Sequence, residues 1–196
     1  HTLPVGPIFR EKRANLGTTE GIMKDVFKIV QVSSNYRRNE GDYVYRIHQP
    51  GAAMASVPGV VVVNTSTLSP HMETLCLCAD VLILHLTWEP DLLPIVNERK
   101  KMGLATVYEI SDNFTAVPSS VTKFEASFSN PACLGTTFQL IRMSDAAQGV
   151  SEILLDRFSF LHDRRVVFEN QIAQVGPPPK PPGEKITIGW GGSLGH

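Results

Sequence analysis

The feature that most constrains this chain is its alternation of short, continuous apolar runs with longer amphipathic stretches. The run at 59–63 is a glycine followed by four valines, and uninterrupted β-branched runs are typical of parallel strands covered on both faces. Strands are expected at 27–32, 59–63, 81–84, 105–110 and 165–168. Strand and helix alternating at this spacing predict an α/β fold, a Rossmann-like doubly wound parallel sheet with helices on both faces.

Helices fit between these runs. The clearest is 90–102, where Glu89 and Asp91 suit the positive end of the helix dipole and Gly103 follows as a stop. Others are expected at 70–78 and after Ser151, a good N-cap residue. Right-handed crossovers would bring the loops after the strands to one edge of the sheet, where ligands bind in such folds.

Length, charge and cysteine content limit the class of protein. The chain has 196 residues, enough for one domain and a piece of a second. Its net charge is -1, and the missing basic excess argues against nucleic acid as a partner. Three cysteines do not form a disulfide framework, no apolar run spans a membrane, and no signal peptide is visible at the start. We therefore expect a cytoplasmic protein.

One stretch indicates a domain boundary. Residues 176–183 read Gly-Pro-Pro-Pro-Lys-Pro-Pro-Gly, a stiff polyproline spacer. We expect a Rossmann-like domain over 1–172, a linker over 173–184, and the first strand and glycine-rich loop of a truncated second domain over 185–196.

Polar residues at the predicted strand ends are the first candidates for a site. His85 ends one strand, where a neutral imidazole can donate to a hydroxyl, but a packed histidine bonded to a carbonyl is slightly favoured. Asp112 and Asn113 follow the next strand and could bind sugar hydroxyls or serve as a base, while an Asx-turn explains them equally well. Strand alternation points Glu109 away from Ile110, and we assign it no role.

Two further segments could meet a phosphate. Gly41–Pro50 is expected to be a loop in which Arg46 offers forked donors to an anion, or a solvated surface loop with its tyrosines on the sheet. The glycines near the end of the chain follow a strand, and their backbone N–H groups could face a phosphate, with a flexible turn equally probable. Cys76 and Cys78 have no matching second pair, so we expect no metal site.

Several pieces occur in the order known from one family. After the first strand the chain has the pattern Gly-x-Tyr-x-Tyr-Arg-Ile-x-x-Pro over 41–50, then an Ala-Asp-Val strand ending in His85, a strand entering an acidic turn, a Ser-Asp-Ala segment at 144–146 and a strand ending in Asn170. Ile-Gly-Trp-Gly-Gly-Ser before a histidine comes last. The chain thereby resembles the N-terminal half of a GT-B glycosyltransferase of the group 1, or family 4, type. Two departures are a single carboxylate, Asp112, in the acidic turn and the lack of a Gly-Gly pair in the first loop.

The resemblance implies a transferase that moves a sugar from a nucleotide-sugar to a glycan, lipid-linked or protein acceptor, with retention, in carbohydrate biosynthesis. It implies no cofactor beyond the nucleotide-sugar substrate and no metal, and it is compatible with peripheral membrane association. His85 and Asp112 would be catalytic, and Gly41, Tyr45, Arg46 and Asn113 would bind substrate. The donor phosphate would meet Gly191, Gly192, Ser193 and His196. A non-catalytic α/β binding module and a GT-B-like sugar-nucleotide epimerase remain alternatives.

Overall fold

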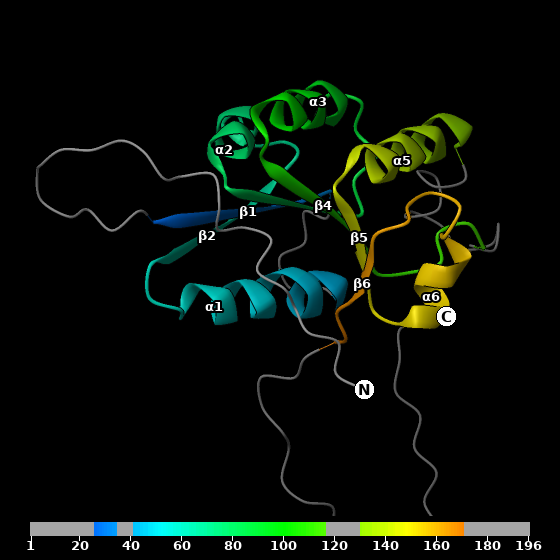
Figure 1. The fold of residues 1–196 in the computed structure, drawn as a ribbon, viewed down its shortest axis with the longest axis horizontal. Coiled ribbons are helices and arrows are strands. Elements are labelled where there is room, and N and C mark those ends of the chain that lie inside the picture. Colours follow the sequence, from blue (N-terminus) through cyan, green and yellow to red (C-terminus); the bar gives the residue numbers. More distant parts are fainter. Residues whose placement is uncertain (1–25, 35–40, 117–129, 171–196) are drawn as a thin grey trace, which may run out of the picture.

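A six-stranded sheet is the centre of the computed structural model, which describes residues 26–34, 41–116 and 130–170 (Figure 1). All its strands are parallel, in the order β2-β1-β3-β4-β5-β6. The strands are β1 (Phe27–Ser33), β2 (Val60–Ser66), β3 (Val81–His85), β4 (Ala105–Ile110), β5 (Ala146–Gly149) and β6 (Arg165–Val167). This confirms the predicted α/β, Rossmann-like class.

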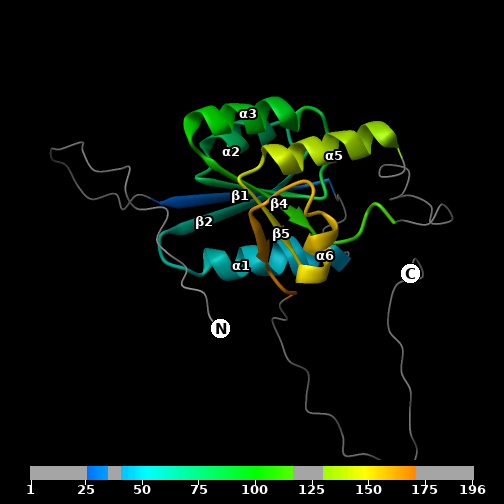
Figure 2. The ribbon, with the colours of Figure 1, turned by 45° about the vertical axis from the view of Figure 1, so that its right-hand side comes forward.

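Helices cover both faces of the sheet. On one side lie α2 (Met72–Cys78), α3 (Leu92–Met102) and α5 (Pro131–Met143), as Figures 1 and 2 show. On the other side lies η1 (Tyr43–His48), a π-helical turn that continues into α1 (Gln49–Ala55). Helix α6 (Glu152–Arg157) packs beside β5 and β6, and its Leu154 and Leu155 belong to the main core. None of these helices is both long and apolar enough to cross a membrane, in the part of the chain that is described.

The strand order contains a switch point between β1 and β3. From β1 the chain steps outward to β2 on one side, and from β3 onward it steps in the opposite direction. Loops that leave β1 and β3 therefore diverge, and such a divergence leaves a crevice outside the carboxyl ends of the two strands. The fold thus marks the ends of β1 and β3 as the place to look for a site.

The two faces of the sheet differ in chemistry. Toward α2, α3 and α5 the strands present an apolar surface that forms the main core with residues such as Val30, Leu82 and Ile110. Toward η1 and α1 the same strands present buried polar side chains, among them Gln31 and Glu109. Gln31 donates from Nε2 to the carbonyl of Ile47 in η1 at 3.0 Å and to Asn64 Oδ1 at 2.8 Å.

Most of the predicted elements are confirmed, with shifted ends. Helix α3 ends at Gly103, whose φ of 70° suits a glycine stop, and Ser151 caps α6 by accepting a hydrogen bond from the amide of Leu154 at 3.3 Å. The prediction of a loop over Gly41–Pro50 was wrong, because η1 and α1 occupy that segment. Strand β5 and helix α5 were not predicted. The expected linker and second-domain start, 173–196, lie outside the described residues.

Candidate functional site at the carboxyl ends of the strands

Four polar residues form one row across the sheet near the carboxyl ends of its strands. We call Ser33, His85, Glu109 and Gln148 the polar row; they are register partners on β1, β3, β4 and β5. Register partners on parallel strands point to the same face, so these side chains lie side by side. The contact of Gln31 with η1, two residues before Ser33, places that face under η1 and α1. The polar row therefore lies at the end of the η1 face, next to the crevice outside the carboxyl ends of β1 and β3.

His85 is the most unusual member of the row. Its side chain is fully buried, and its Nδ1 lies 3.2 Å from the hydroxyl oxygen of Ser33. Its Nε2 is buried and has no hydrogen-bond partner among the described residues. Burial, and secondarily the positive charge of Arg46, lower the pKa of His85 to about 3. The ring is therefore neutral at physiological pH, with one nitrogen left to bond a ligand.

Arg46 reaches the polar row from η1. It is 3% exposed, donates from Nε to Glu109 Oε1 at 2.6 Å, and also contacts that oxygen through Nη2. Its Nη1 donates to the carbonyl of Phe168 and to Asn170 Oδ1, 3.1 Å away, after β6. An arginine buried this deeply needs such partners, because an unpaired buried charge is costly. The guanidinium therefore lies in the protein interior, whereas the sequence analysis expected Arg46 on a loop.

Glu109 receives donors from both sides. Arg46 bonds one carboxylate oxygen and the side-chain amide of Gln148 bonds the other. Burial raises the pKa of Glu109 to about 7, opposed by the charge and hydrogen bonds of Arg46. The alternation of β4 turns Glu109 away from the apolar face, as predicted, but the sequence gave no sign that it pairs with Arg46.

The turn after His85 contains a strained backbone conformation and a buried hydroxyl that has no hydrogen-bond partner in the described segments. Leu86 has a φ of 47°, the one positive value outside glycine in the described segments. Thr87 is fully buried and its Oγ1 lacks a hydrogen-bond partner there too. Strained backbone and unsatisfied buried polar atoms are uncommon in native proteins and concentrate at functional sites. Both occur here within two residues of the unpaired nitrogen of His85.

The carboxylate of Glu89 links the three loops around this turn by hydrogen bonds. Its carboxylate accepts hydrogen bonds from Ser34 Oγ after β1, Thr67 Oγ1 after β2 and the amide of Trp88 after β3, each at 2.9 Å. These bonds span the switch point. The strained turn is therefore held between fixed neighbours, and Glu89 does more than complement the dipole of α3.

The other predicted site residues lie in the turn after β4, in or just before η1, or outside the described residues. Asp112 is exposed beyond the end of β4, and Ser111 next to it donates to Asp42, which follows Gly41, at 3.0 Å. Asn113 accepts a hydrogen bond from Thr115 Oγ1 at 2.7 Å, so its side-chain oxygen has a partner within its own turn. Two contacts therefore join segments that the sequence analysis singled out. Ser111, in the turn after β4, bonds Asp42 beside Gly41, and Arg46 bonds Glu109 of the polar row.

Tyr45 is 45% exposed, and no contact ties it to the polar row in the described segments. The predicted phosphate-binding residues lie outside the described residues: Gly191, Gly192, Ser193 and His196. Sequence reasoning missed Ser33, Thr87, Glu109 and Gln148 as neighbours of His85. The signal that could have found them is the common register of polar residues one position before, or at, the end of each strand.

This arrangement suits an uncharged polar ligand group. A neutral imidazole, hydroxyls and an internally neutralised ion pair can exchange hydrogen bonds with hydroxyls without burying a net charge. No group of three or more His, Cys, Asp or Glu side chains able to hold a metal occurs in the described segments. The chain matches no protein-family model and no protein of curated function.

Proposed function

We propose that this chain is the acceptor-side domain of a GT-B-type glycosyltransferase, with the polar row forming one wall of its sugar-handling cleft. The observation that carries this proposal is the buried, unpartnered Nε2 of His85 at the switch point of the sheet. The resemblance of the sequence to group 1 transferases supports it, because that family has a polar residue at the end of the corresponding strand.

In this proposal His85 bonds a hydroxyl of the sugar through Nε2, while Ser33 fixes the ring through Nδ1 at 3.2 Å. Asp112, exposed after β4, accepts a further hydroxyl from donor or acceptor. The transferase would work in the cytoplasm, and the diphosphate would meet the backbone of Gly191 and Gly192. Transfer then depends chiefly on positioning and on stabilising the departing diphosphate.

The role of Arg46 is revised by its contacts. Because Glu109, Phe168 and Asn170 occupy its donors, we propose that Arg46 positions the polar row and the end of β6 and does not touch the diphosphate. Its positive charge also helps to keep His85 neutral. In this scheme Arg46 acts on the ligand only through His85 and Glu109.

Turnover by the natural full-length protein tests the proposal. Release of nucleoside diphosphate is measured with UDP-, GDP- and dTDP-sugars, alone and with acceptor glycans. We expect one donor to be consumed, and His85→Gln to lower kcat/KM about 100-fold, as loss of a positioning or polarising contact does. The matched control is His71→Gln, because His71 is an exposed histidine before α2. Equal activity of both variants, or no turnover of any donor, would contradict the proposal.

A second candidate, a non-catalytic α/β ligand-binding module, is favoured by one observation. Arg46, the cation that a transferase could aim at a diphosphate, is consumed by internal bonds. A binding module would bind a sugar or nucleotide-sugar with His85-dependent affinity but would release no nucleoside diphosphate. Calorimetric titration alongside the turnover assay separates the two.

A further inference from the structure

The two edges of the sheet differ in how they are protected from other chains. At one edge β6 has three residues, and Arg165 is one of them. At the other edge β2 has seven residues, four of which are consecutive valines, and no charged residue occurs from Val57 to Pro70. Shortness, charge and proline within the strand normally keep an edge from pairing with another chain, and β2 has none of these protections. Every residue of β2 is partly or largely exposed, so this edge is open to a further strand.

The register with β1 determines which backbone groups of β2 point outward. Phe27 of β1 donates its amide to the carbonyl of Gly59 at 2.8 Å. Backbone groups of successive strand residues point in opposite directions, so the odd-numbered residues of β2 bond β1 and the even-numbered residues face away from the sheet. The residues that face away are Val60, Val62, Asn64 and Ser66. Each has one amide and one carbonyl with which it can bond a neighbouring strand.

Two of these outward groups are already used by the turns at the ends of β2. The amide of Val60 donates to the carbonyl of Val57 at 3.1 Å, and the carbonyl of Ser66 accepts from the amide of Ser69 at 3.0 Å. The outward groups that have no backbone partner among the described residues are the Val60 carbonyl, both groups of Val62 and of Asn64, and the Ser66 amide. These six groups are what the edge offers to another strand.

The unpaired groups match those of a second copy of the same strand. When two β2 strands pair antiparallel about a two-fold axis at Val63, Val62 lies opposite Asn64 of the other copy, and Val60 lies opposite Ser66. Residues opposed in this way exchange their amide and carbonyl bonds, so all six unpaired groups of each copy find partners. The Val60 amide and the Ser66 carbonyl, which the turns already use, fall opposite each other and need no further partner.

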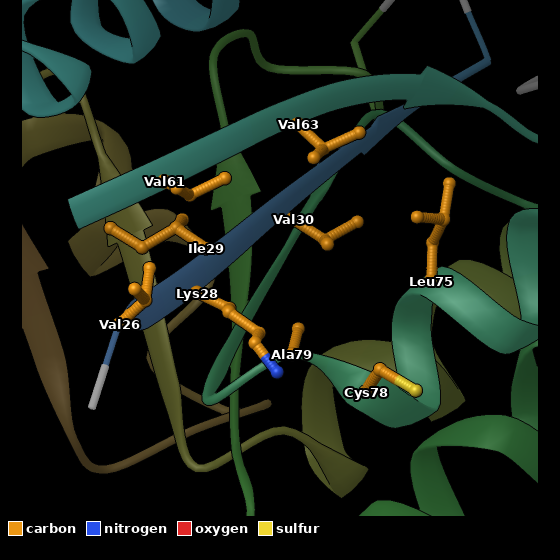
Figure 3. A pocket seen from close by; sticks show the side chains of 9 residues that line it. All are labelled: Val26, Lys28, Ile29, Val30, Val61, Val63, Leu75, Cys78 and Ala79. Carbon is orange, nitrogen blue, oxygen red and sulfur yellow. The ribbon is translucent and has the colours of Figure 1, made fainter. Parts of the chain in front are cut away.

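The side chains around this axis are apolar or β-branched. Val61 and Val63 both line the cavity between β1, β2 and α2, so they share the α2 face of the sheet (Figure 3). In the paired strands Val63 meets its own copy, and Val61, which is 48% exposed, meets Thr65. Val57 and Leu68 are 52% and 71% exposed and lie just beyond opposite ends of β2. Antiparallel pairing brings Val57 of one copy toward Leu68 of the other and reduces the exposure of both.

We propose that this chain forms a two-fold dimer in which two β2 strands pair antiparallel about Val63 and join two sheets into one. The net charge of -1 does not oppose this association. A strand in another register would leave some of the six outward groups without partners, which favours a second copy over an unrelated peptide. The proposal is independent of the transferase function, because no residue of the polar row lies on β2.

Sedimentation equilibrium of the 196-residue chain measures the association directly. We expect the mass to rise with concentration from 21.5 kDa to twice that value and no further. Val62→Pro removes an outward amide but no bond to β1, so the fold should persist. Two bonds between the copies are lost, and we expect the Kd of the dimer to rise about 100-fold. The matched control is Val167→Pro on β6, where Phe168 bonds β5 and the Val167 amide points outward; its Kd should be unchanged.

A disulfide trap tests the register and does not depend on a proline variant that folds. Val63→Cys places two thiols opposite each other at the axis, where Cα atoms are about 4.5 Å apart, within the range of a disulfide. We expect oxidised glutathione to convert this variant to a covalent dimer. The matched control is Val61→Cys on the same face, whose two copies lie about 13 Å apart and should stay unlinked. Both variants are made with Cys78→Ser, because Cys78 is exposed.

Three results would overturn the proposal. The first is a monomer at every concentration up to the millimolar range, or an equal Kd for the wild type and Val62→Pro. The second is equal cross-linking at positions 61 and 63, which would exclude an axis at Val63. The third is growth beyond the dimer, which would indicate open-ended pairing of edges in place of a closed two-fold pair.

Discussion

Two neighbouring rows of residues cross the same four strands and share almost nothing in chemistry. The polar row is Ser33, His85, Glu109 and Gln148, and one position earlier lies an apolar row of Val32, Leu84, Tyr108 and Ala147. Every member of the apolar row belongs to the main core under α2, α3 and α5. The polar row faces η1 and holds an unpaired nitrogen and a buried ion pair. The apolar row stabilises the sheet by hydrophobic burial. The polar row lowers that stability, because its buried polar groups lose hydration, and it leaves a nitrogen that a ligand could bond.

The comparison teaches that burial alone does not identify the core of this fold. His85 and Leu84 are both fully buried neighbours on β3. The Leu84 side chain gains the full hydrophobic contribution of about 2 kcal/mol, whereas the His85 ring loses hydration and recovers one hydrogen bond. A residue kept under such conditions is better explained by a ligand than by packing.

The largest expected effect is the loss of Arg46. In Arg46→Met the Glu109 carboxylate stays buried without its cation, and we expect the free energy of unfolding at pH 8 to fall by about 3–5 kcal/mol. The double variant Arg46→Met/Glu109→Gln should recover part of this loss, since no charge is then stranded. Urea unfolding measures both. A double variant less stable than Arg46→Met would mean that the ion pair is not the unit that holds η1 on the sheet.

The next effect separates the two faces on a single strand. Leu84→Ala removes a fully buried side chain from the apolar face, and we expect a loss of about 3 kcal/mol. Ile83→Ala, on the η1 face, removes a half-buried side chain and should cost about half as much. Urea unfolding of the two variants makes the comparison. Equal losses would show that the faces contribute alike.

The two titrating members of the polar row predict opposite dependences on pH. Folding lowers the pKa of His85 from 6.5 to about 3, so below pH 6.5 only the unfolded chain takes up this proton and stability falls with pH. Folding raises the pKa of Glu109 from 4.5 to about 7, so between these values the folded protein takes up the proton and stability rises as pH falls. In the wild type the two effects nearly cancel between pH 6.5 and 4.5.

Variants expose each effect separately. Between pH 6.5 and 5 we expect His85→Gln to gain about 2 kcal/mol relative to the wild type, and Glu109→Gln to lose about 2 kcal/mol. Urea unfolding at several pH values measures these differences. Parallel pH profiles for the wild type and both variants would show that neither group has the shifted pKa.

The smallest effect is expected from replacing one glycine in a helix on each side of the sheet. A Cβ on Gly51 of α1 would lie 2.6 Å from Gln31 Nε2, which must then move from its bonds to Ile47 and Asn64. We expect Gly51→Ala to cost about 1 kcal/mol. A Cβ on Gly135 of α5 meets nothing within 4 Å, so Gly135→Ala should gain about 0.5 kcal/mol from reduced chain entropy. Thermal unfolding gives the signs, and equal signs would contradict the close approach of α1 to the sheet.

The sequence predicted the parts of the fold that local patterns determine. Valine-rich runs and the glycine stop of α3 at Gly103 each belong to one segment, and each was confirmed. Strand β5, with the sequence Ala-Ala-Gln-Gly, was missed because it has no β-branched residue and forms only between neighbouring strands. Its identity depends on the sheet around it, which one segment does not show.

The candidate site was predictable residue by residue but not as a contact set. The position of His85 at a strand end followed from the pattern of β3. The pairing of Arg46 with Glu109 links residues 63 positions apart, and Arg46 meets Asn170 across 124 positions. Such contacts depend on register and on a helix where a loop was expected, so Arg46 was assigned to a phosphate that its geometry does not favour.

The most direct test of the central claim is nitrogen NMR of the histidine rings in the labelled chain. If the polar row binds sugar, the His85 ring stays neutral from pH 8 to 5, and its Nε2 signal shifts on addition of a nucleotide-sugar or acceptor glycan that the protein uses. The ring of His71 serves as the internal reference and stays unchanged by ligand. A His85 ring that titrates near pH 6.5, or an Nε2 signal indifferent to every such ligand, would contradict this account.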